Sequence, residues 1–214
     1  MYGIWDILWR VEARLRGLDF RYVPSGHSDA IAPYRIKDYA DSGLTLRRFF
    51  DTIAPRWKPD PSDEAIDLEC GKGGAVSVLA RYFARADGID ISPELIKIGR
   101  NNLRKLRVQN ARLRVRDASQ FEDLDRYGFV YMFNPFPSEV MLSVVANINR
   151  SLLRKPRRMT VLYLKPLHID LFEPARFQRL AEVYPCRSEY PFVLLVSPLQ
   201  ECGDVSRAAA PART

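Results

Sequence analysis

The stretch Ala65-Ile66-Asp67-Leu68-Glu69-Cys70-Gly71-Lys72-Gly73-Gly74-Ala75 decides the fold of this chain. It begins as a short apolar run that ends in an acid, and it continues as a glycine-dense turn. Apolar residues at helical spacing follow from Val76 to Ala84. This order predicts a strand, a loop and a helix. Because the backbone N–H groups of such a loop face a ligand, the stretch also predicts a small-molecule site.

Spacing separates the kinds of glycine loop that this turn could be. A phosphate-binding P-loop has a glycine five residues before a Gly-Lys-Ser/Thr triplet, but Ile66 occupies that position and Gly73 follows Lys72. A dinucleotide fingerprint can start at Gly71, but its third glycine would fall on Val76. A P-loop is therefore excluded, and a dinucleotide site remains as an alternative.

The pattern Asp67-x-x-x-Gly71-x-Gly73 resembles the first motif of the class I S-adenosylmethionine-dependent methyltransferases. The resemblance implies that these three residues hold the methionine half of the cofactor. The family has a further glycine where this chain has Glu69. If that position has a positive φ, a Cβ costs roughly 1–2 kcal/mol there, whereas a carboxylate favours a nearby sulfonium or ammonium group. Glu69 is therefore placed in the cofactor site, with an impaired site as the alternative.

A second acid ends the next predicted strand, Ala86 to Asp90. Ser92 and Pro93 follow as the N-cap and first residue of a predicted helix that runs to about Arg107. Two carboxylate oxygens can accept hydrogen bonds from the cis-diol of a ribose, and the resemblance implies this role for Asp90. A plain turn or capping role for Asp90 is the alternative.

The third predicted strand, Ala111 to Val115, leads to a third acid, Asp117. The resemblance implies that Asp117 contacts the adenine amino group and that Ala118 offers a backbone N–H to the cofactor. Asp117 is also suited to cap the short segment Ser119 to Leu124. The proposed ligand contacts thus follow successive strand ends, where open parallel sheets bind their ligands.

The run Gly128 to Phe133 predicts a buried parallel strand and ends in Asn134-Pro135-Phe136-Pro137. This ending resembles the Asn/Asp-Pro-Pro-Tyr/Phe motif of methyltransferases that methylate amines. The resemblance implies that the catalytic residues are Asn134, which orients an acceptor nitrogen, and Phe136, which stacks on the acceptor. The order Pro-Phe-Pro departs from the motif, and an ordinary strand-to-helix turn is the alternative.

Strands and helices alternate along the chain, with helices expected at Thr45 to Ile53, Ser138 to Leu153 and Asp170 to Val183, and strands at Arg157 to Leu164, Tyr184 to Ser188 and Tyr190 to Ser197. This alternation favours an α/β fold with a doubly wound, mostly parallel sheet. The resemblance implies the seven-stranded, Rossmann-like methyltransferase fold, with two antiparallel strands at the end. An N-terminal helical extension or lid is expected over 1–60, with an amphipathic helix at 1–18, the methyltransferase domain over 61–200 and a flexible tail over 201–214.

The composition limits the class of protein. With 214 residues, of which 47% are apolar and 28% charged, the chain suits one globular domain. The sequence contains no run of about 18 apolar residues, so no membrane span is predicted. The N-terminus lacks the pattern of a secretory signal. The three cysteines are widely spaced and odd in number, so neither a disulfide framework nor a metal site is expected. A cytoplasmic location is expected instead.

Together these observations predict a methyltransferase with S-adenosyl-L-methionine as its cofactor, acting on a nitrogen in a small molecule or a protein side chain. The net charge of +7 leaves a nucleic acid acceptor, and hence an RNA methyltransferase, as a less favoured possibility. An NAD-dependent oxidoreductase and a catalytically impaired binding protein with the same fold also remain possible. The oligomeric state stays open.

Overall fold

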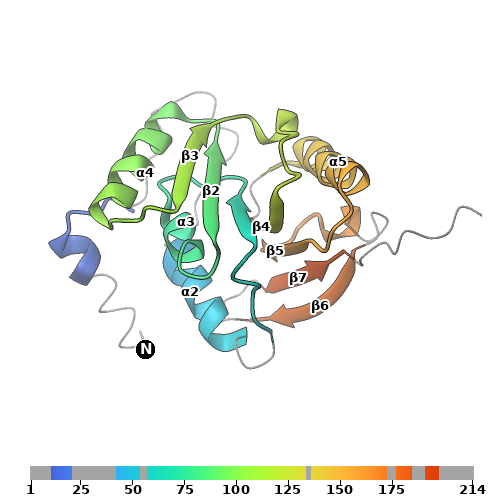
Figure 1. The fold of residues 1–214 in the computed structure, drawn as a ribbon, viewed down its shortest axis with the longest axis horizontal. Helices are drawn as coiled ribbons and strands as arrows, with labels where there is room; N and C mark the ends of the chain where they lie inside the picture. The colour runs from blue at the N-terminus through green and yellow to red at the C-terminus, as the bar shows by residue number, and fades with distance from the viewer. Residues whose placement is uncertain are drawn as a thin grey trace, which may run out of the picture.

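The computed structural model describes residues 11–20, 42–53, 57–133, 136–172, 177–184 and 191–197. This part of the chain forms a seven-stranded sheet with helices on both faces (Figure 1). The elements in chain order are α2 (Ser42–Ile53), β1 (Glu64–Asp67), α3 (Gly74–Leu79), β2 (Arg85–Asp90), α4 (Pro93–Lys105), β3 (Ala111–Val115), the 3₁₀ turn η1 (Ala118–Gln120), β4 (Tyr127–Phe133), α5 (Ser138–Arg154), β5 (Thr160–Leu164), the 3₁₀ turn η2 (Ile169–Leu171), β6 (Gln178–Val183) and β7 (Phe192–Val196).

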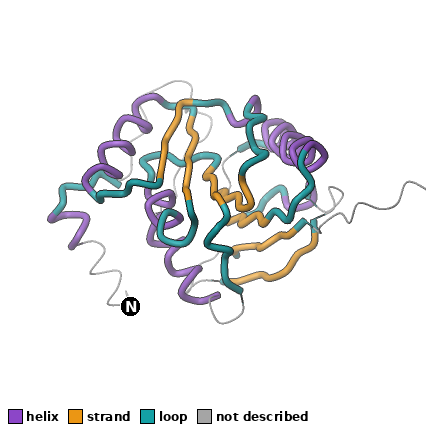
Figure 2. The backbone as a smooth tube through the Cα atoms, viewed as in Figure 1, coloured by secondary structure: helices purple, strands orange, loops and turns teal. Residues whose placement is uncertain are grey.

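The strands lie in the order β3-β2-β1-β4-β5-β7-β6. The first five are parallel, whereas β7 runs antiparallel to both β5 and β6. Figure 2 shows β6 and β7 side by side at one end of the sheet. The predicted mostly parallel seven-stranded fold, with two antiparallel strands at its end, is thus confirmed.

The central strands are apolar on both faces because helices cover both. Along β4, Phe129 and Tyr131 join the core beneath α2, α3 and α4, and Val130 and Met132 join the core beneath α5. This alternation follows from the two-residue period of a strand. Helix α2 confirms the helix expected up to Ile53 and adds Leu46, Phe49, Phe50 and Ile53 to the first core.

One prediction near the C-terminus is wrong. The helix expected from Asp170 to Val183 is instead the short turn η2 and the edge strand β6. A strand is also expected from Tyr184 to Ser188; β6 ends at Val183, and Tyr184 itself is not part of a strand. The residues 185–188 lie outside the described part. A bulge between Arg179 and Ala181 leaves Leu180 exposed, so β6 lacks the regular alternation of a half-buried strand. Its pairing with β7 makes it a strand.

Smaller differences concern element ends. The helix expected from Val76 to Ala84 ends at Leu79, the helix expected to reach Arg107 ends at Lys105, and the strand expected from Arg157 begins at Thr160. Arg157 instead donates hydrogen bonds to the carbonyl groups of Leu124 and Tyr127, at 2.7 and 2.9 Å.

Part of the N-terminal segment is described. Residues 11–15 are helical, and the helix ends where the N–H of Leu18 donates to the carbonyl of Ala13 at 2.8 Å, with Gly17 at φ 58°. None of the helices in the described ranges has the length and apolarity needed to cross a membrane. The domain boundaries expected near residues 60 and 200 stay predictions, and the tail 201–214 lies outside the described residues.

Candidate functional site

The glycine loop runs from the carboxyl end of β1 to the start of α3, between the ends of β2 and β4. The N–H of Leu68 donates to the carbonyl of Tyr131 on β4 at 3.2 Å, and the N–H of Cys70 donates to that of Ile89 on β2 at 2.9 Å. These bonds extend the strand pairing into the loop. The loop is therefore attached on both sides to strands whose ends carry predicted site residues, Asp90 after β2 and Asn134 after β4.

Asp90 binds this loop directly through its side chain. Its Oδ2 accepts from the N–H of Gly71 at 2.9 Å and its Oδ1 from the N–H of Ser92 at 2.8 Å. Burial raises the pKa of Asp90, while the two N–H donors act in the opposite direction. A carboxylate has about four acceptor positions, so two remain for the hydroxyl groups of a ligand. The Oγ of Ser92 caps α4 as predicted.

Asp67 and Glu69 lie beside Asp90. The Oδ1 of Asp67 accepts one long hydrogen bond, 3.3 Å, from the N–H of Glu69. Burial, and to a lesser degree the charge of Asp90, raises the pKa of Asp67 to about 8. The pKa of Glu69 is likewise raised well above its usual value by burial and then by Asp90 and Asp67. Three crowded carboxyl groups with raised pKa values favour a cationic ligand, because a positive charge allows them to ionise.

The backbone of Glu69 is not strained, although the resemblance places a glycine of the family at this position. Among the described residues other than glycine, only Arg107 and Lys165 have positive φ values. The left-handed positions of the loop are Gly71, at φ 48°, and Gly73, at φ 78°, where glycine carries no Cβ penalty. The backbone of the loop therefore accommodates Glu69 without that cost.

Asp117 and Ala118 follow β3 at the same edge of the sheet. The N–H of Arg116 donates to the carbonyl of Asp90 at 3.0 Å, which joins the ends of β3 and β2. Asp117 accepts from the N–H of Ser119 at 2.8 Å, so its predicted capping role is confirmed. Ala118 is buried in the core beneath α5. Their contacts with adenine stay predictions.

The two residues expected to be catalytic are described only in part. Asn134 lies outside the described residues. Phe136 is half-buried and packs against the core beneath α5. Both follow the end of β4, which pairs with β1 so that Tyr131 lies opposite Asp67. The chain topology thus brings this segment to the edge that carries the acids, and the catalytic roles stay predictions.

Ile91 directly follows Asp90 and is not among the site residues expected from the sequence. Its side chain is 58% exposed, although a large apolar side chain gains free energy when it leaves water. Its place between a strand-end acid and a helix cap is the signal that could have identified it. An exposed apolar surface beside Asp90 suits the flat face of a ring.

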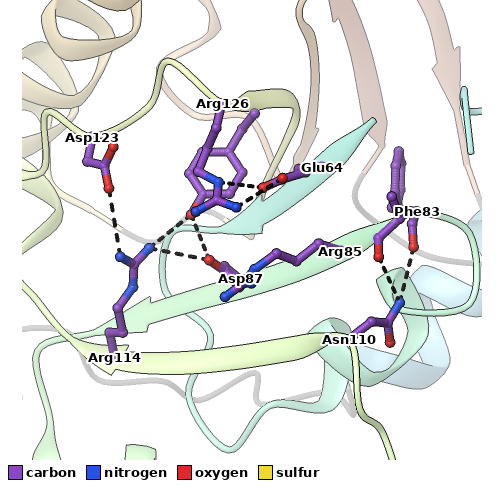
Figure 3. Close-up of polar contacts among 10 residues, drawn as sticks. Glu64, Phe83, Arg85, Asp87, Asn110, Arg114, Asp123 and Arg126 are labelled. Atoms are coloured by element: carbon purple, nitrogen blue, oxygen red, sulfur yellow. Dashed lines mark hydrogen bonds and ion pairs between the residues drawn. The ribbon is translucent and has the colours of Figure 1, made fainter. Parts of the chain in front are cut away.

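A second group of charged residues lies near the opposite ends of the strands (Figure 3). Asp87 is fully buried and accepts from the Arg85 Nε and the Tyr127 hydroxyl, each at 2.8 Å, and from the Arg114 Nη2 at 3.4 Å. Because donors surround this carboxylate, it is an internal part of the fold. No cluster of three or more side chains suited to a metal ion occurs in the described ranges.

Comparison with known proteins finds methyltransferases. Residues 65–155 match the family model described as a methyltransferase domain. Over 64 residues the chain is 36% identical to an uncharacterised methyltransferase of Schizosaccharomyces pombe, and the match covers 30% of this chain. The chain spans only a quarter of that relative, 25% of its length.

Solved methyltransferases share the fold. Magnesium protoporphyrin IX methyltransferase from Synechocystis PCC 6803, with bound S-adenosylmethionine, has a TM-score of 0.57 and 15% identity, covering 92% of each chain. An RNA methyltransferase from Salinibacter ruber, in complex with S-adenosyl-L-homocysteine, has a TM-score of 0.52 and 19% identity, covering 75% of this chain and 95% of that one. At these identities the likeness shows the fold, which is the predicted one.

Proposed function

We propose that this chain transfers a methyl group from S-adenosylmethionine to an acceptor nitrogen, because residues 65–155 match a methyltransferase domain and the sheet has the order of the class I methyltransferase fold. One observation carries this proposal. Asp67 and Asp90 lie at the ends of adjacent parallel strands, and the glycine loop that follows Asp67 donates the N–H of Gly71 to Asp90.

The residues present fit this cofactor. Asp67 has a pKa of about 8 and accepts a single long hydrogen bond within the described part of the chain, so an ammonium or sulfonium group would supply the positive partner that favours its ionised form. Asp90 retains acceptor capacity for ribose hydroxyl groups. Ile91 offers an exposed apolar surface for the adenine ring, and Asp117 and Ala118 follow at the next strand end. Glu69 adds a third carboxyl group beside the cationic half.

S-adenosylmethionine supplies a methyl group on a sulfonium, which is a good leaving group. The protein therefore has mainly to align the acceptor and to exclude water, and such positioning can lower a barrier by several kcal/mol. The glycine loop and the strand-end acids hold the donor side. Asn134, directly after β4, would orient the lone pair of the acceptor nitrogen, and Phe136 would flank it.

We propose an amine of a small molecule or of a protein side chain as the acceptor. We give weaker support to a nucleic acid acceptor, because both arginines of α5 are paired with acids, so this helix does not present an unpaired basic patch. Arg154 lies 2.9 Å from Asp125, and Arg150 lies 3.3 Å from Glu122. An RNA acceptor would make binding fall steeply with salt concentration, and filter binding at rising salt measures this directly.

Calorimetric titration of the full chain tests the proposal, with S-adenosylmethionine, S-adenosylhomocysteine and NAD as ligands. We expect the wild type to bind the first two ligands and not NAD. Asp90→Asn removes the charge and one acceptor of a backbone N–H, so the Kd should rise at least tenfold, about 1.4 kcal/mol.

Asp87→Asn is the matched control, because Asp87 is a buried acid on the same strand that faces the internal network. We expect this variant to lower the melting temperature and to keep the wild-type Kd at a temperature where it is folded. Binding of NAD alone, or equal changes in Kd for both variants, would contradict the proposed site.

A further inference from the structure

A buried amide joins the N-terminal segment to the glycine loop. Asn102 on α4 is 0% exposed. Its Oδ1 accepts from the N–H of Asp19 at 3.0 Å, and its Nδ2 donates to the carbonyl of Asp19 at 2.8 Å and to that of Lys72 at 3.1 Å. One side chain thus binds both backbone groups of Asp19 and one carbonyl of the loop.

An ion pair reinforces this connection. The Nζ of Lys72 lies 2.7 Å from the Oδ1 of Asp19, and the side chain of Lys72 is only 6% exposed whereas that of Asp19 is 51% exposed. The segment before Asp19 is also attached to α4, since the Lys105 ammonium donates to the carbonyl of Gly17. The Nη1 of Arg16 donates to the carbonyl of Lys105 at 3.4 Å. Residues 16–19 therefore lie along the C-terminal half of α4.

Helix α4 reaches the loop closely because it carries Gly99 one turn before Asn102. A Cβ at Gly99 would lie 3.0 Å from the carbonyl carbon and 3.2 Å from the carbonyl oxygen of Lys72. Residues three apart share one face of a helix. Gly99 and Asn102 thus present a single face to the backbone of Lys72, the first by leaving room and the second by donating a hydrogen bond.

Lys72 stands between the two left-handed residues of the loop, Gly71 and Gly73. Glycines populate many backbone conformations when nothing restrains them. On one side the loop is held by Asp90, which accepts from the N–H of Gly71. On the other side it is held by Asn102 through the carbonyl of Lys72. The two side chains thus contact the loop from opposite sides of Lys72, in addition to the backbone hydrogen bonds of Leu68 and Cys70.

We propose that Asn102 and Asp19 are positioning residues that keep the glycine loop in its ligand-binding conformation, so that the N-terminal segment 16–19 sets the cofactor affinity. This inference rests on the proposed function for the identity of the ligand. Its physical basis is that a loop ordered before binding loses less conformational entropy when the ligand arrives.

Two measurements on the full chain test this inference. Amide hydrogen exchange of residues 70–74 without cofactor reports the order of the loop, and calorimetry with S-adenosylmethionine reports the affinity. For Asn102→Ala we expect exchange in this segment to be about tenfold faster and the Kd to rise about fivefold or more.

Asn110→Ala is the matched control. Asn110 also donates its amide to backbone carbonyls. It donates to that of Phe83 at 3.2 Å (Figure 3) and to that of Ala80 at 3.0 Å. It lies at the opposite ends of the strands, before β3. This variant should lower the melting temperature as Asn102→Ala does, and it should leave both the exchange of residues 70–74 and the Kd unchanged.

Asp19→Ala provides a second variant, because its half-exposed side chain can be removed without a cavity in the core. We expect a change in the same direction as for Asn102→Ala, with a Kd about two- to threefold higher. Unchanged exchange of residues 70–74 in both variants, or equal effects of Asn102→Ala and Asn110→Ala, would overturn the inference. If the wild type does not bind S-adenosylmethionine, the proposed function fails, and hydrogen exchange alone then decides whether Asn102 holds the loop.

Discussion

At the scale of single residues, Asp67 combines burial with a functional position. Its carboxyl group has a pKa of about 8 in the folded protein, against an ordinary value of 3.8, mainly because of burial. As the pH rises from about 4 to about 8, the unfolded chain releases this proton before the folded protein does. The stability that the protonated carboxyl group contributes is therefore complete below pH 4 and is lost as the pH approaches 8.

The variant Asp67→Asn removes this titration and keeps an oxygen that can accept from the N–H of Glu69. We expect it to be more stable than the wild type at pH 9, by roughly 1–3 kcal/mol, and to show a smaller advantage at pH 5. Urea denaturation at several pH values measures this difference. Parallel curves for the two proteins across pH 4–9 would show that Asp67 does not have a raised pKa.

The same residue predicts a pH dependence of ligand binding. A cationic ligand favours the ionised carboxylate, so the affinity of the wild type for S-adenosylmethionine should increase between pH 6 and pH 8. Asp67→Asn should bind more weakly and should lack this increase. Calorimetry at three pH values measures both effects, and an increase that persists in the variant would assign it to Glu69 or Asp90.

At the scale of elements, two helix ends use the same hydrogen-bond pattern with different residues. At the end of α4 the N–H of Val108 donates to the carbonyl of Leu103 and the N–H of Arg107 to that of Arg104, each at 3.0 Å. Arg107 has a φ of 57°. The N-terminal helix ends in the same way with Gly17 at the left-handed position, where glycine is the usual residue.

Arg107→Gly should therefore stabilise the protein. The substitution removes the free-energy cost of a Cβ in the left-handed conformation. This gain is partly offset because glycine has greater conformational freedom in the unfolded chain. The expected gain is about 0.5–1 kcal/mol, or a rise in melting temperature of about 1–3 °C. Arg104→Gly, inside the last turn of α4, should have the opposite sign. Thermal unfolding of both variants checks the pair, and a fall for Arg107→Gly would contradict the capping argument.

At the scale of the whole molecule, α2 packs into the core of the sheet domain, even though it lies before the first strand, β1, in the sequence. The ring of Phe49 is fully buried and lies 4.8 Å, centroid to centroid, from that of Phe192 on β7. Phe50 stacks on Tyr82, after α3, at 4.2 Å. A helix at the start of the described core thus connects the parallel and the antiparallel parts of the sheet.

Phe49→Ala should consequently destabilise the whole protein. Truncation of a buried phenylalanine costs about 3–5 kcal/mol, because it removes apolar contacts and leaves a cavity. Leu142→Ala is the control, since Leu142 on α5 is exposed and should change stability by less than about 0.5 kcal/mol. Urea denaturation distinguishes the two. A cost below about 1 kcal/mol for Phe49→Ala would mean that α2 is a detachable lid.

The amino-acid sequence alone determined the features that depend on neighbours along the chain. The apolar run before Asp67, the glycines at 71 and 73 and the Ser92-Pro93 cap specify strand, loop and helix through local geometry, and the acids fall at successive strand ends. The fold class and the edge that carries Asp67 and Asp90 could therefore be predicted.

Only the tertiary structure decided features that depend on distant partners. β6 is a strand because it pairs with β7, whereas its own residues fit a helix equally well. The role of Asn102 appears only when Asp19 and Lys72, far apart in the chain, meet at one amide. The pKa of Asp67 depends on how deeply the packed sheet buries it. Periodicity reports which face of an element is apolar, but hydrogen-bond partners and desolvation are properties of groups that only folding brings together.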